Sequence, residues 1–402
     1  MNCYEDLKWR GLIKDATNEE LLSEKLNNEQ LSFYIGTDPT ADSLHIGHLS
    51  SFLIATRLEK YGHIPYLLVG GATGRIGDPR PSAERSIIPD DVFEANLVDM
   101  KKQVEKIFGF EVVDNYEWSK DINFLDFLRD YGKHFPVNYM LSKETIKTRL
   151  DVGITYTEFS YMIMQALDFL WLLENKDVTL QVAGSDQWGN ITAGVDLIRK
   201  KAGKEAFAFT MPLVTNKDGE KISKSEGKTI WLDENKTTPY ELYQYFLNTD
   251  DSVVINYLKV FTFLTKDQIE VLEELTNSEP EKRMAGKALA FEVVKFVHGE
   301  EAAKEARMTS EEVFEQGVTT NMPSKEMSLD TIHNGINIMD LLLMVDLVPS
   351  KSEARRLIEQ NGISVNSEKV LDPNLIIDES YIQDSVIILQ KGKKTYLKLD
   401  VK

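Results

Sequence analysis

Residues 34–48 read YIGTDPTADSLHIGH, and this stretch decides the fold. It begins inside residues 31–36 (LSFYIG), a short continuous apolar run that is typical of a buried strand. It ends where apolar residues start to recur at helical spacing over residues 45–61, with Gly62 as the stop signal. A strand, a turn and a helix in this order predict the first half of a βαβ unit.

The same alternation continues along the first half of the chain. Further apolar strand candidates lie at residues 65–69 (PYLLV), 178–183 (VTLQVA) and 207–214, and helical patterns separate them. We therefore expect an α/β fold with a Rossmann-like parallel sheet, formed by residues 1–215 as a nucleotide-binding catalytic domain. Ligands usually bind at the carboxyl ends of such strands.

The remainder of the chain predicts three further parts. Residues 216–320 would hold a mobile, lysine-containing loop and an α-helical domain, because residues 240–306 are rich in Glu, Lys, Leu and Ala at helical spacing. Residues 308–327 show no clear period and are a linker candidate, and we expect the linker itself at residues 321–336. Residues 337–402 predict a small α+β domain, with two helices followed by short strands.

Composition sets limits on partners and location. The chain has 402 residues, 42% hydrophobic and 28% charged, which is typical of a globular protein. A single cysteine and an N-terminus without an apolar signal core predict a reduced, cytoplasmic chain. The net charge of −19 disfavours nucleic acid on average. Residues 337–402 carry nine Lys and Arg against ten Asp and Glu, so this segment should repel a polyanion least.

Two histidines form the first chemical signal. His45 and His48 are three residues apart at the expected start of a helix, where free N–H groups and the helix dipole attract anions. Gly36 and Gly47 would let a phosphate or a flat ring approach the backbone. The arrangement suits a polyphosphate, although a capped helix with two surface histidines is the alternative interpretation.

Two lysines form the second signal. Residues 219–227 read GEKISKSEG, in which Lys221 and Lys224 stand among small residues in a mobile cationic loop. Lysine serves as a point charge on phosphate groups. A solvated surface loop is the alternative for this motif taken alone, and the pairing with residues 45–48 strengthens the phosphate interpretation.

Together the motifs HIGH and KISKS resemble the signature of class I aminoacyl-tRNA synthetases. The resemblance covers essentially the whole chain, is nearest to the bacterial tyrosine branch, and includes GSDQWGNITAG at residues 184–194. It implies an ATP-dependent ligase that forms tyrosyl-adenylate and then charges tRNA(Tyr). It also implies Mg²⁺ travelling with the phosphates, no metal site on the protein, and a homodimer.

An apolar helix supplies the third signal. Residues 157–175 read TEFSYMIMQALDFLWLLEN, which puts Tyr161, Gln165 and Asp168 on one face. Asp168 is expected to be buried and to need a partner, although a purely structural aspartate remains an alternative. The resemblance implies that Asp168 and Tyr34 bind the substrate phenol, and that Tyr161 and Gln165 hold its α-amino group. Phenylalanine would leave both phenol-binding groups unpaired.

Other roles are carried over from the family by matching residues. The resemblance implies further tyrosine-binding residues at Asp78 and Gln187. It implies that ATP is bound by Gly36, Asp38, Gly47, Gly184, Asp186 and Lys224. It implies that the catalytic residues are Thr40, His45, His48, Lys221 and Lys224, so Lys224 belongs to both sets.

The chain departs from the family after Asp78. Many relatives carry a lysine there that steers pyrophosphate, whereas residues 79–85 read PRPSAER and are one residue shorter. Arg80 or Arg85 is expected to substitute for this lysine. The lysine loop itself follows the general class I form, with both lysines present.

The C-terminal part resembles a small RNA-binding module. Residues 348–366 (VPSKSEARRLIEQNGISVN) carry the resemblance and predict tRNA contacts by Lys351, Arg355 and Arg356. Further lysines crowd a late turn at residues 391, 393 and 394. A solvated helix whose charges serve solubility is the alternative.

Three rival functions remain open at this point. A tryptophanyl-tRNA synthetase shares both motifs but lacks the RNA-binding tail. Other HIGH-type nucleotidyltransferases are usually shorter and have no helical anticodon domain. A non-catalytic RNA-binding relative is disfavoured because HIGH and both loop lysines are intact.

Overall fold

The computed structural model describes residues 1–79, 88–151, 153–222, 224–225, 228–316, 324–366, 368–383, 385–392 and 395–402. The chain divides into two units. The first joins Met1–Lys236 to Ser252–Glu274, and the second joins Thr237–Asp251 to Leu275–Lys402.

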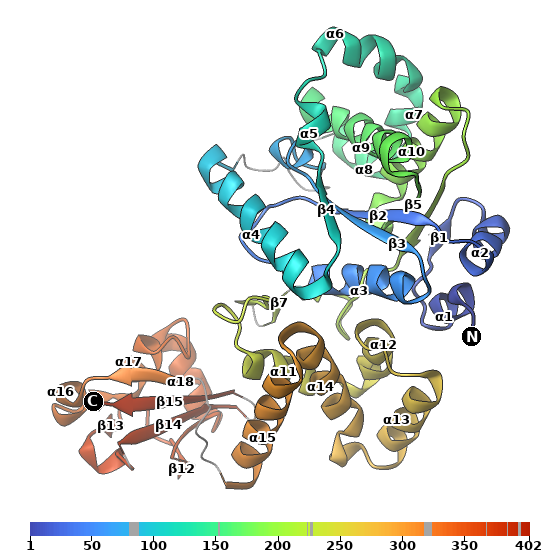
Figure 1. Cartoon of the computed structure of the whole chain (residues 1–402). Helices are drawn as coiled ribbons and strands as arrows, with labels where there is room; N and C mark the ends of the chain where they lie inside the picture. Colours follow the sequence, from blue (N-terminus) through green and yellow to red (C-terminus); the bar gives the residue numbers. More distant parts are fainter. Residues whose placement is uncertain are drawn as a thin grey trace. The chain divides into compact units, whose positions relative to one another are not determined.

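A six-stranded sheet in the order β1-β6-β5-β2-β3-β4 forms the centre of the first unit (Figure 1). The strands from β2 to β6 pair in parallel, and the short β1 pairs antiparallel with β6 at the edge. Their bounds are β1 (Asp15–Ala16), β2 (Ser32–Thr37), β3 (Ile64–Val69), β4 (Glu111–Asp114), β5 (Val178–Gly184) and β6 (Phe207–Met211). The predicted parallel α/β sheet is confirmed.

The strand order places a switch point between β2 and β5. From β2 the chain moves outward through β3 and β4, whereas β5 and β6 lie on its other side. The connections leave the carboxyl ends of β2 and β5 in opposite directions, and a crevice opens there in sheets of this type. Residues 34–48 begin in β2 and therefore enter this crevice.

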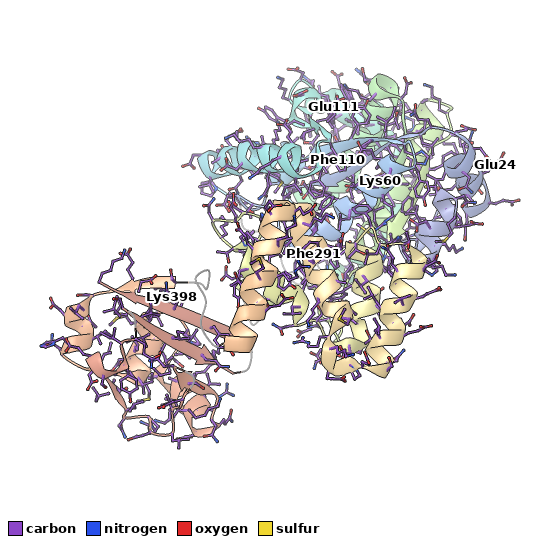
Figure 2. The ribbon with its side chains drawn as sticks, turned by 60° about the horizontal axis from the view of Figure 1, so that its bottom comes forward. Glu24, Lys60, Phe110, Glu111, Phe291 and Lys398 are labelled. Carbon is purple, nitrogen blue, oxygen red and sulfur yellow. The ribbon has the colours of Figure 1, made fainter. Side chains whose placement is uncertain are left out.

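Helices cover both faces of the sheet, with α9 and α10 on the opposite side from α3 (Figure 1). Phe110 and Glu111 mark the entry into β4 (Figure 2). The helices before residue 237 are α1 (Cys3–Trp9), α2 (Glu19–Asn28), α3 (Ile46–Lys60), α4 (Asp90–Phe108), α5 (Tyr116–Ser119), α6 (Phe124–Asp126), α7 (Val137–Leu141), α8 (Glu144–Leu150), α9 (Tyr156–Lys176) and α10 (Trp188–Lys201).

Helix α9 is fixed firmly at its start and along its length. Thr155 caps the helix and forms a capping box with Glu158. Arg149 donates two hydrogen bonds of 2.9 Å to the same buried Glu158 carboxylate. On α10, Gly194 lets the two helices approach, because a Cβ there would lie 3.1 Å from the ring of Phe169. This packing holds the polar face of α9 against the sheet.

The second unit contains helices and a separate small sheet. Its helices before residue 317 include α11 (Pro239–Leu247), α14 (Met284–His298) and α15 (Glu300–Gln316), and Phe291 lies on α14 (Figure 2). The remaining helices, α12 (Asp251–Phe261) and α13 (Lys266–Ser278), lie mostly in the first unit. The α-helical character predicted for residues 240–306 is confirmed.

The C-terminal part is the predicted α+β fold. A five-stranded sheet has the order β12-β11-β14-β15-β9, and β10 pairs with β13. Its elements are β9 (Ser324–Met327), α16 (Leu329–His333), β10 (Ile336–Asn337), α17 (Ile338–Met344), α18 (Lys351–Glu359), β11 (Ile363–Val365), β12 (Glu368–Lys369), β13 (Ile376–Ile377), β14 (Val386–Lys391) and β15 (Thr395–Val401).

Residues 324–333 differ from the linker expected over residues 321–336. They form β9, which pairs in parallel with β15, and α16. Met327 and Ile332 are buried in the core of the C-terminal domain. Single apolar residues among polar ones give no periodic signal, and a strand partner some 70 residues away cannot be recognised from this segment alone.

Candidate active site

A cavity of about 230 Å³ opens at the carboxyl ends of β2 and β5. Strand residues form its floor, and α9 contributes one wall. Its lining includes these predicted site residues: Tyr34, Gly36, Asp38, Thr40, His48, Asp78, Tyr161, Gln165, Asp168 and Gln187. The sequence therefore identified most of the residues around this cavity.

Asp168 forms a buried acidic group at the cavity. Its side chain accepts hydrogen bonds of 2.9 Å from Asn115 Nδ2 and Trp118 Nε1. Burial raises the pKa of the Asp168 carboxyl to about 7, and the two hydrogen bonds oppose this shift only in part. Neither Asn115 nor Trp118 was predicted. Their only sequence signal is that polar residues follow directly after the buried strand β4.

Tyr34 presents a hydroxyl group to the same cavity. Its side chain is 1% exposed, and its Oη has no hydrogen-bond partner among the described residues. Burial, together with the nearby Asp168 charge, raises the pKa of Tyr34 well above its usual value. An unpaired hydroxyl and a buried carboxylate can together receive one group that both donates and accepts a hydrogen bond.

Acidic groups line another part of the cavity. Tyr161 Oη donates to Asp38 Oδ2 at 3.1 Å, and Thr73 Oγ1 donates to Asp38 Oδ1 at 2.9 Å. Gln187 Nε2 donates to Asp78 Oδ2 at 2.8 Å. Burial, followed by the Asp38 and Asp78 charges, raises the pKa of Tyr161 well above its usual value. Two carboxylates in this part of the cavity attract a cationic ligand group more than a phosphate.

Amides complete this part of the cavity. The Oε1 atoms of Gln165 and Gln181 are buried without a hydrogen-bond partner among the described residues. Asn190 Nδ2 donates to Asp78 Oδ1 at 3.2 Å and to Gln187 Oε1 at 3.0 Å. Thr73, Gln181 and Asn190 were missed by the sequence analysis, because nothing in their local pattern distinguishes them from ordinary polar residues.

The two histidines stack at the start of α3. Their ring centroids are 3.9 Å apart. His45 Nδ1 accepts from the Gly47 N–H at 3.0 Å, and His48 Nδ1 accepts from the His45 N–H at 3.1 Å. These bonds place the proton of each neutral ring on Nε2. Burial lowers the pKa of His48 to about 3 and also lowers that of His45, so both rings are neutral donors at pH 7.

His48 lines the cavity, whereas His45 and Gly47 are not among its lining residues. Gly184 and Asp186 lie next to the carboxyl end of β5, also outside the lining. A Cβ on Gly184 would lie 2.8 Å from Asp186 Oδ1, so glycine permits this close approach.

The lysine loop is held near these residues. Thr215 and Lys221 pair across its base, and β7 (Lys224–Ser225) pairs with β8 (Lys228–Thr229). Lys221 Nζ lies 3.5 Å from Asp186 Oδ2. The structure describes only the backbone of Lys224. Arg80 and Arg85 lie outside the described residues.

The exit of the loop touches the histidine motif directly. The Ile46 N–H donates to the Ile230 carbonyl at 3.1 Å, and the Leu232 N–H donates to the Leu44 carbonyl at 2.8 Å. The two signals found about 175 residues apart in the sequence are thus joined by backbone hydrogen bonds.

The basic residues predicted for tRNA lie on α18 and are exposed. Lys351 pairs with Asp340, and Arg356 Nη2 lies 3.9 Å from Glu353 Oε1. Lys391 Nζ lies 3.9 Å from the same Glu353 oxygen. The lysines at positions 393 and 394 lie outside the described residues.

Among the residues that the structure describes, no group of three or more His, Cys, Asp and Glu side chains could hold a metal ion. No helix in the same part of the chain has the length and apolarity needed to cross a membrane.

Comparison with known families assigns the class of protein. Residues 26–315 match the family model of class I tRNA synthetases (W and Y). The chain belongs to this family. Residues 313–399 match a second model, the SYY-like C-terminal domain of tyrosine–tRNA ligase.

Full-length relatives narrow the family to the tyrosine–tRNA ligases. The enzyme of Listeria welshimeri is 45% identical over 425 residues, covering 100% of both chains. That of Geobacillus stearothermophilus is 45% identical over 414 residues, covering 98% of this chain and 99% of the relative. The predicted enzyme class, a tyrosine–tRNA ligase that uses ATP, is confirmed.

Solved structures of tRNA synthetases have a fold similar to that of this chain. A C-terminally truncated mitochondrial tyrosyl-tRNA synthetase from Aspergillus nidulans matches with a TM-score of 0.71 at 32% identity, covering 78% of this chain and 94% of that one. A tryptophanyl-tRNA synthetase from Encephalitozoon cuniculi matches with a TM-score of 0.57 at 17% identity, covering 75% and 87%. The second likeness concerns the fold alone.

Proposed function

We propose that the cavity binds L-tyrosine, with its phenol between Tyr34 and Asp168, and that the chain joins this tyrosine to AMP and then to tRNA(Tyr). The observation that carries the proposal is the pairing of an unpartnered buried hydroxyl with a buried carboxylate. The phenolic O–H donates to Asp168, and the phenolic oxygen accepts from Tyr34.

This pairing discriminates against the other aromatic amino acids. Phenylalanine has neither a donor nor an acceptor, so both buried groups stay unpaired, at a cost of about 1–3 kcal/mol for each. The indole of tryptophan is a donor only. It can satisfy Asp168 but leaves the Tyr34 hydroxyl without an acceptor. The two buried groups of the cavity therefore favour tyrosine over tryptophan.

The α-ammonium group is held by the acidic part of the cavity. Tyr161, Gln165 and Asp78 were expected there from the sequence, and their positions support this role. Gln187, expected only as a tyrosine-binding residue, donates to Asp78. We add Asp38, which was expected in the phosphate region. Its carboxylate faces Tyr161 and Thr73, and it would repel phosphate but attract an ammonium group.

ATP occupies the neighbouring region in this proposal, near Gly36, Gly47, Gly184 and Asp186. The tyrosine carboxylate attacks the α-phosphorus and pyrophosphate leaves. The nucleophile is already an anion, so the protein supplies no base and acts by positioning and charge stabilisation.

The catalytic groups are therefore donors and cations. Neutral His45 and His48 donate from Nε2, Thr40 donates from its hydroxyl, and Lys221 and Lys224 place positive charge on the phosphates. Mg²⁺ accompanies the phosphates of ATP in this proposal.

We also propose that residues 1–215, 216–320 and 337–402 are functional regions, in a cytoplasmic enzyme. Residues 324–333 belong with the last of these regions, because β9 pairs with β15. In the last region, Lys351, Arg355 and Arg356 contact tRNA phosphates. Their exposure on α18 supports this role.

A homodimer forms through the surface around α6 and α7 in this proposal. Large apolar side chains are exposed there, including Phe124 (66%), Leu125 (69%) and Val137 (58%). A cluster of exposed apolar residues typically marks a protein interface. Light scattering should give a dimer for the wild type, and Phe124→Asp should shift the population towards monomers. A wild-type monomer at micromolar concentration would refute this part.

The enzymatic proposal is tested by ATP–pyrophosphate exchange with each of the twenty amino acids. We expect exchange with tyrosine only. Exchange with tryptophan instead would establish the tryptophan alternative, and no exchange with any amino acid would support a non-catalytic relative. Charging of tRNA(Tyr) by the same preparation tests the second step.

A further inference from the structure

A buried ionic cluster lies outside the cavity, where α1 and α3 meet the end of α12. Asp6, Arg10 and Arg57 are 5%, 4% and 3% exposed. Arg10 Nε donates to Asp6 Oδ1 at 2.8 Å, and Arg57 Nη1 lies 4.0 Å from Asp6 Oδ2. Two guanidinium groups share one carboxylate, so the cluster has one positive charge in excess.

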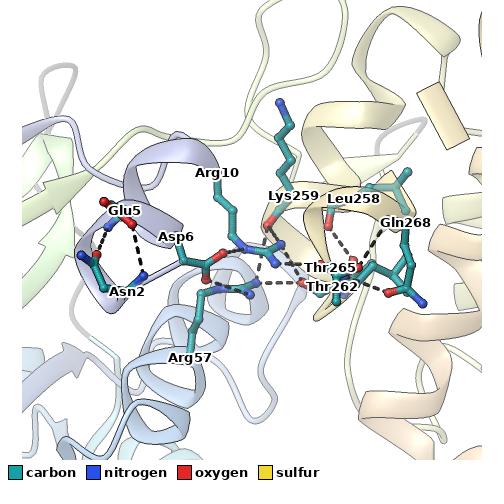
Figure 3. Close-up of polar contacts among 11 residues, drawn as sticks. Asn2, Glu5, Asp6, Arg10, Arg57, Leu258, Lys259, Thr262, Thr265 and Gln268 are labelled. Atoms are coloured by element: carbon teal, nitrogen blue, oxygen red, sulfur yellow. Dashed lines mark hydrogen bonds and ion pairs between the residues drawn. The ribbon is translucent and has the colours of Figure 1, made fainter. Parts of the chain in front are cut away.

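The excess charge faces the carboxyl end of α12 (Figure 3). Arg10 Nη2 donates to the Leu264 carbonyl at 2.7 Å, and Arg57 Nη2 donates to the Thr262 carbonyl at 2.8 Å. Arg10 Nη1 also donates to the Lys259 carbonyl at 3.1 Å. Carbonyls at a helix end lack intrahelical donors and carry the negative end of the dipole. The two arginines therefore fix the end of α12 to α1 and α3.

A second contact ties α12 to the lysine loop. Tyr257 lies on α12, is 3% exposed, and donates its hydroxyl to the Thr215 carbonyl at 3.0 Å. Thr215 pairs directly with Lys221 at the base of the loop. The Asn216 N–H donates to the Glu220 carbonyl at 2.8 Å and closes the turn between them. Tyr257 thus holds Thr215, the residue that pairs with Lys221.

The other end of the loop is held by α3. Backbone hydrogen bonds join Ile230 and Leu232 to the residues on either side of His45, where α3 begins. The same helix carries Arg57, which grips α12. Helices α3 and α12 therefore hold the two ends of the loop and are fixed to each other.

We propose that Tyr257 is a positioning residue for adenylation: through Thr215 it holds Lys221 at the nucleotide end of the site, on a helix fixed by Arg10 and Arg57. The inference rests on the proposed function, since it concerns the rate at which tyrosyl-adenylate forms. Tyr257 has no place in the cavity lining, and it acts through the backbone that it binds.

The test is the Tyr257→Phe variant, which removes one hydroxyl from an otherwise unchanged ring. We expect the rate constant of tyrosyl-adenylate formation in single-turnover quench-flow to fall about five- to tenfold, the order expected for one lost hydrogen bond. The dissociation constant for tyrosine should stay within twofold of wild type, because the phenol and ammonium contacts are untouched. Unchanged tyrosine binding also shows that the variant is folded.

A matched control and a double variant make the test specific. In Tyr4→Phe the same atom is lost from a buried tyrosine whose hydroxyl donates to Glu19 Oε1 at 2.7 Å, and the rate should not change. In a Lys221→Ala background, Tyr257→Phe should change the rate less than twofold, because the group that it positions is gone.

The outcomes separate the two proposals. A wild-type rate in Tyr257→Phe, or a full loss that persists without the Lys221 amine, overturns the positioning role and leaves the enzyme function standing. Wild-type protein that makes no tyrosyl-adenylate overturns the proposed function itself.

Discussion

The affinity for tyrosine should depend on pH through Asp168. Its pKa of about 7 in the free protein means that the carboxyl is mostly ionised at pH 8 and mostly protonated at pH 6. Both of its oxygens already accept N–H donors from Asn115 and Trp118. Protonation turns one acceptor site into an O–H donor and removes the negative charge, so the hydrogen bond from the phenolic O–H is weakened. Tyrosine should therefore bind to the ionised form.

The expected change in tyrosine affinity corresponds to the titration of one carboxyl group, that of Asp168. With a pKa of about 7, roughly one molecule in eleven is ionised at pH 6 and about ten in eleven at pH 8, so the affinity should fall about tenfold, or about 1.4 kcal/mol. Calorimetric titration with tyrosine at pH 6, 7 and 8 measures this directly. Phenylalanine, which makes no hydrogen bond to Asp168, provides the control and should show no comparable change.

The raised pKa of Asp168 should also make the free energy of unfolding depend on pH. This dependence runs opposite to that of tyrosine affinity, because the stability falls as the pH rises. A carboxyl whose pKa is raised in the folded state contributes stability below its unfolded pKa and loses that contribution as the pH rises through the folded value, here about 7. Relative to Asp168→Asn, the ligand-free wild type should thus gain about 1.4 kcal/mol in free energy of unfolding between pH 8 and pH 6. Equal tyrosine affinity at pH 6 and pH 8, within twofold, would refute the reasoning.

Three further predictions concern other parts of the chain. Lys224→Ala should lower the rate of adenylation far more than it weakens tyrosine binding, and pre-steady-state kinetics with equal losses in both would contradict this. Deletion of residues 337–402 should leave ATP–pyrophosphate exchange intact but abolish charging of tRNA. Normal charging by the truncated enzyme would contradict the RNA-binding role of this region. Arg149→Met should lower the free energy of unfolding by about 3–5 kcal/mol in chemical denaturation, because it leaves the Glu158 carboxylate buried and unpaired.

The sequence predicted the parallel sheet from local patterns, and it predicted most of the cavity residues from these patterns together with the family resemblance. Residues 34–48 combine a buried strand with a helix start, and residues 157–175 carry their polar side chains on one face of a helix. Once the strand-helix alternation sets a parallel sheet, these segments meet at its carboxyl edge.

Contacts between distant segments could not be predicted in this way. Asn115 and Trp118, which hold Asp168, lie about 50 residues before it in the chain, in a short segment without a periodic pattern. Asp38 was assigned to the phosphate region by its match to the family, and its hydrogen bonds with Tyr161 and Thr73 come from segments distant in the sequence. Such partners become visible only when the sheet brings the segments together.

The described lining of the cavity is acidic, and Lys221 lies on a loop beside it. The described lining contains Asp38, Asp78 and Asp168 but no lysine or arginine, and His48 is neutral there. In the proposed site, these carboxylates attract the tyrosine ammonium group. Lys221 supplies positive charge from a loop that is held at both ends. The anchors of this loop at Thr215 and Ile230 should therefore affect the rate of adenylation.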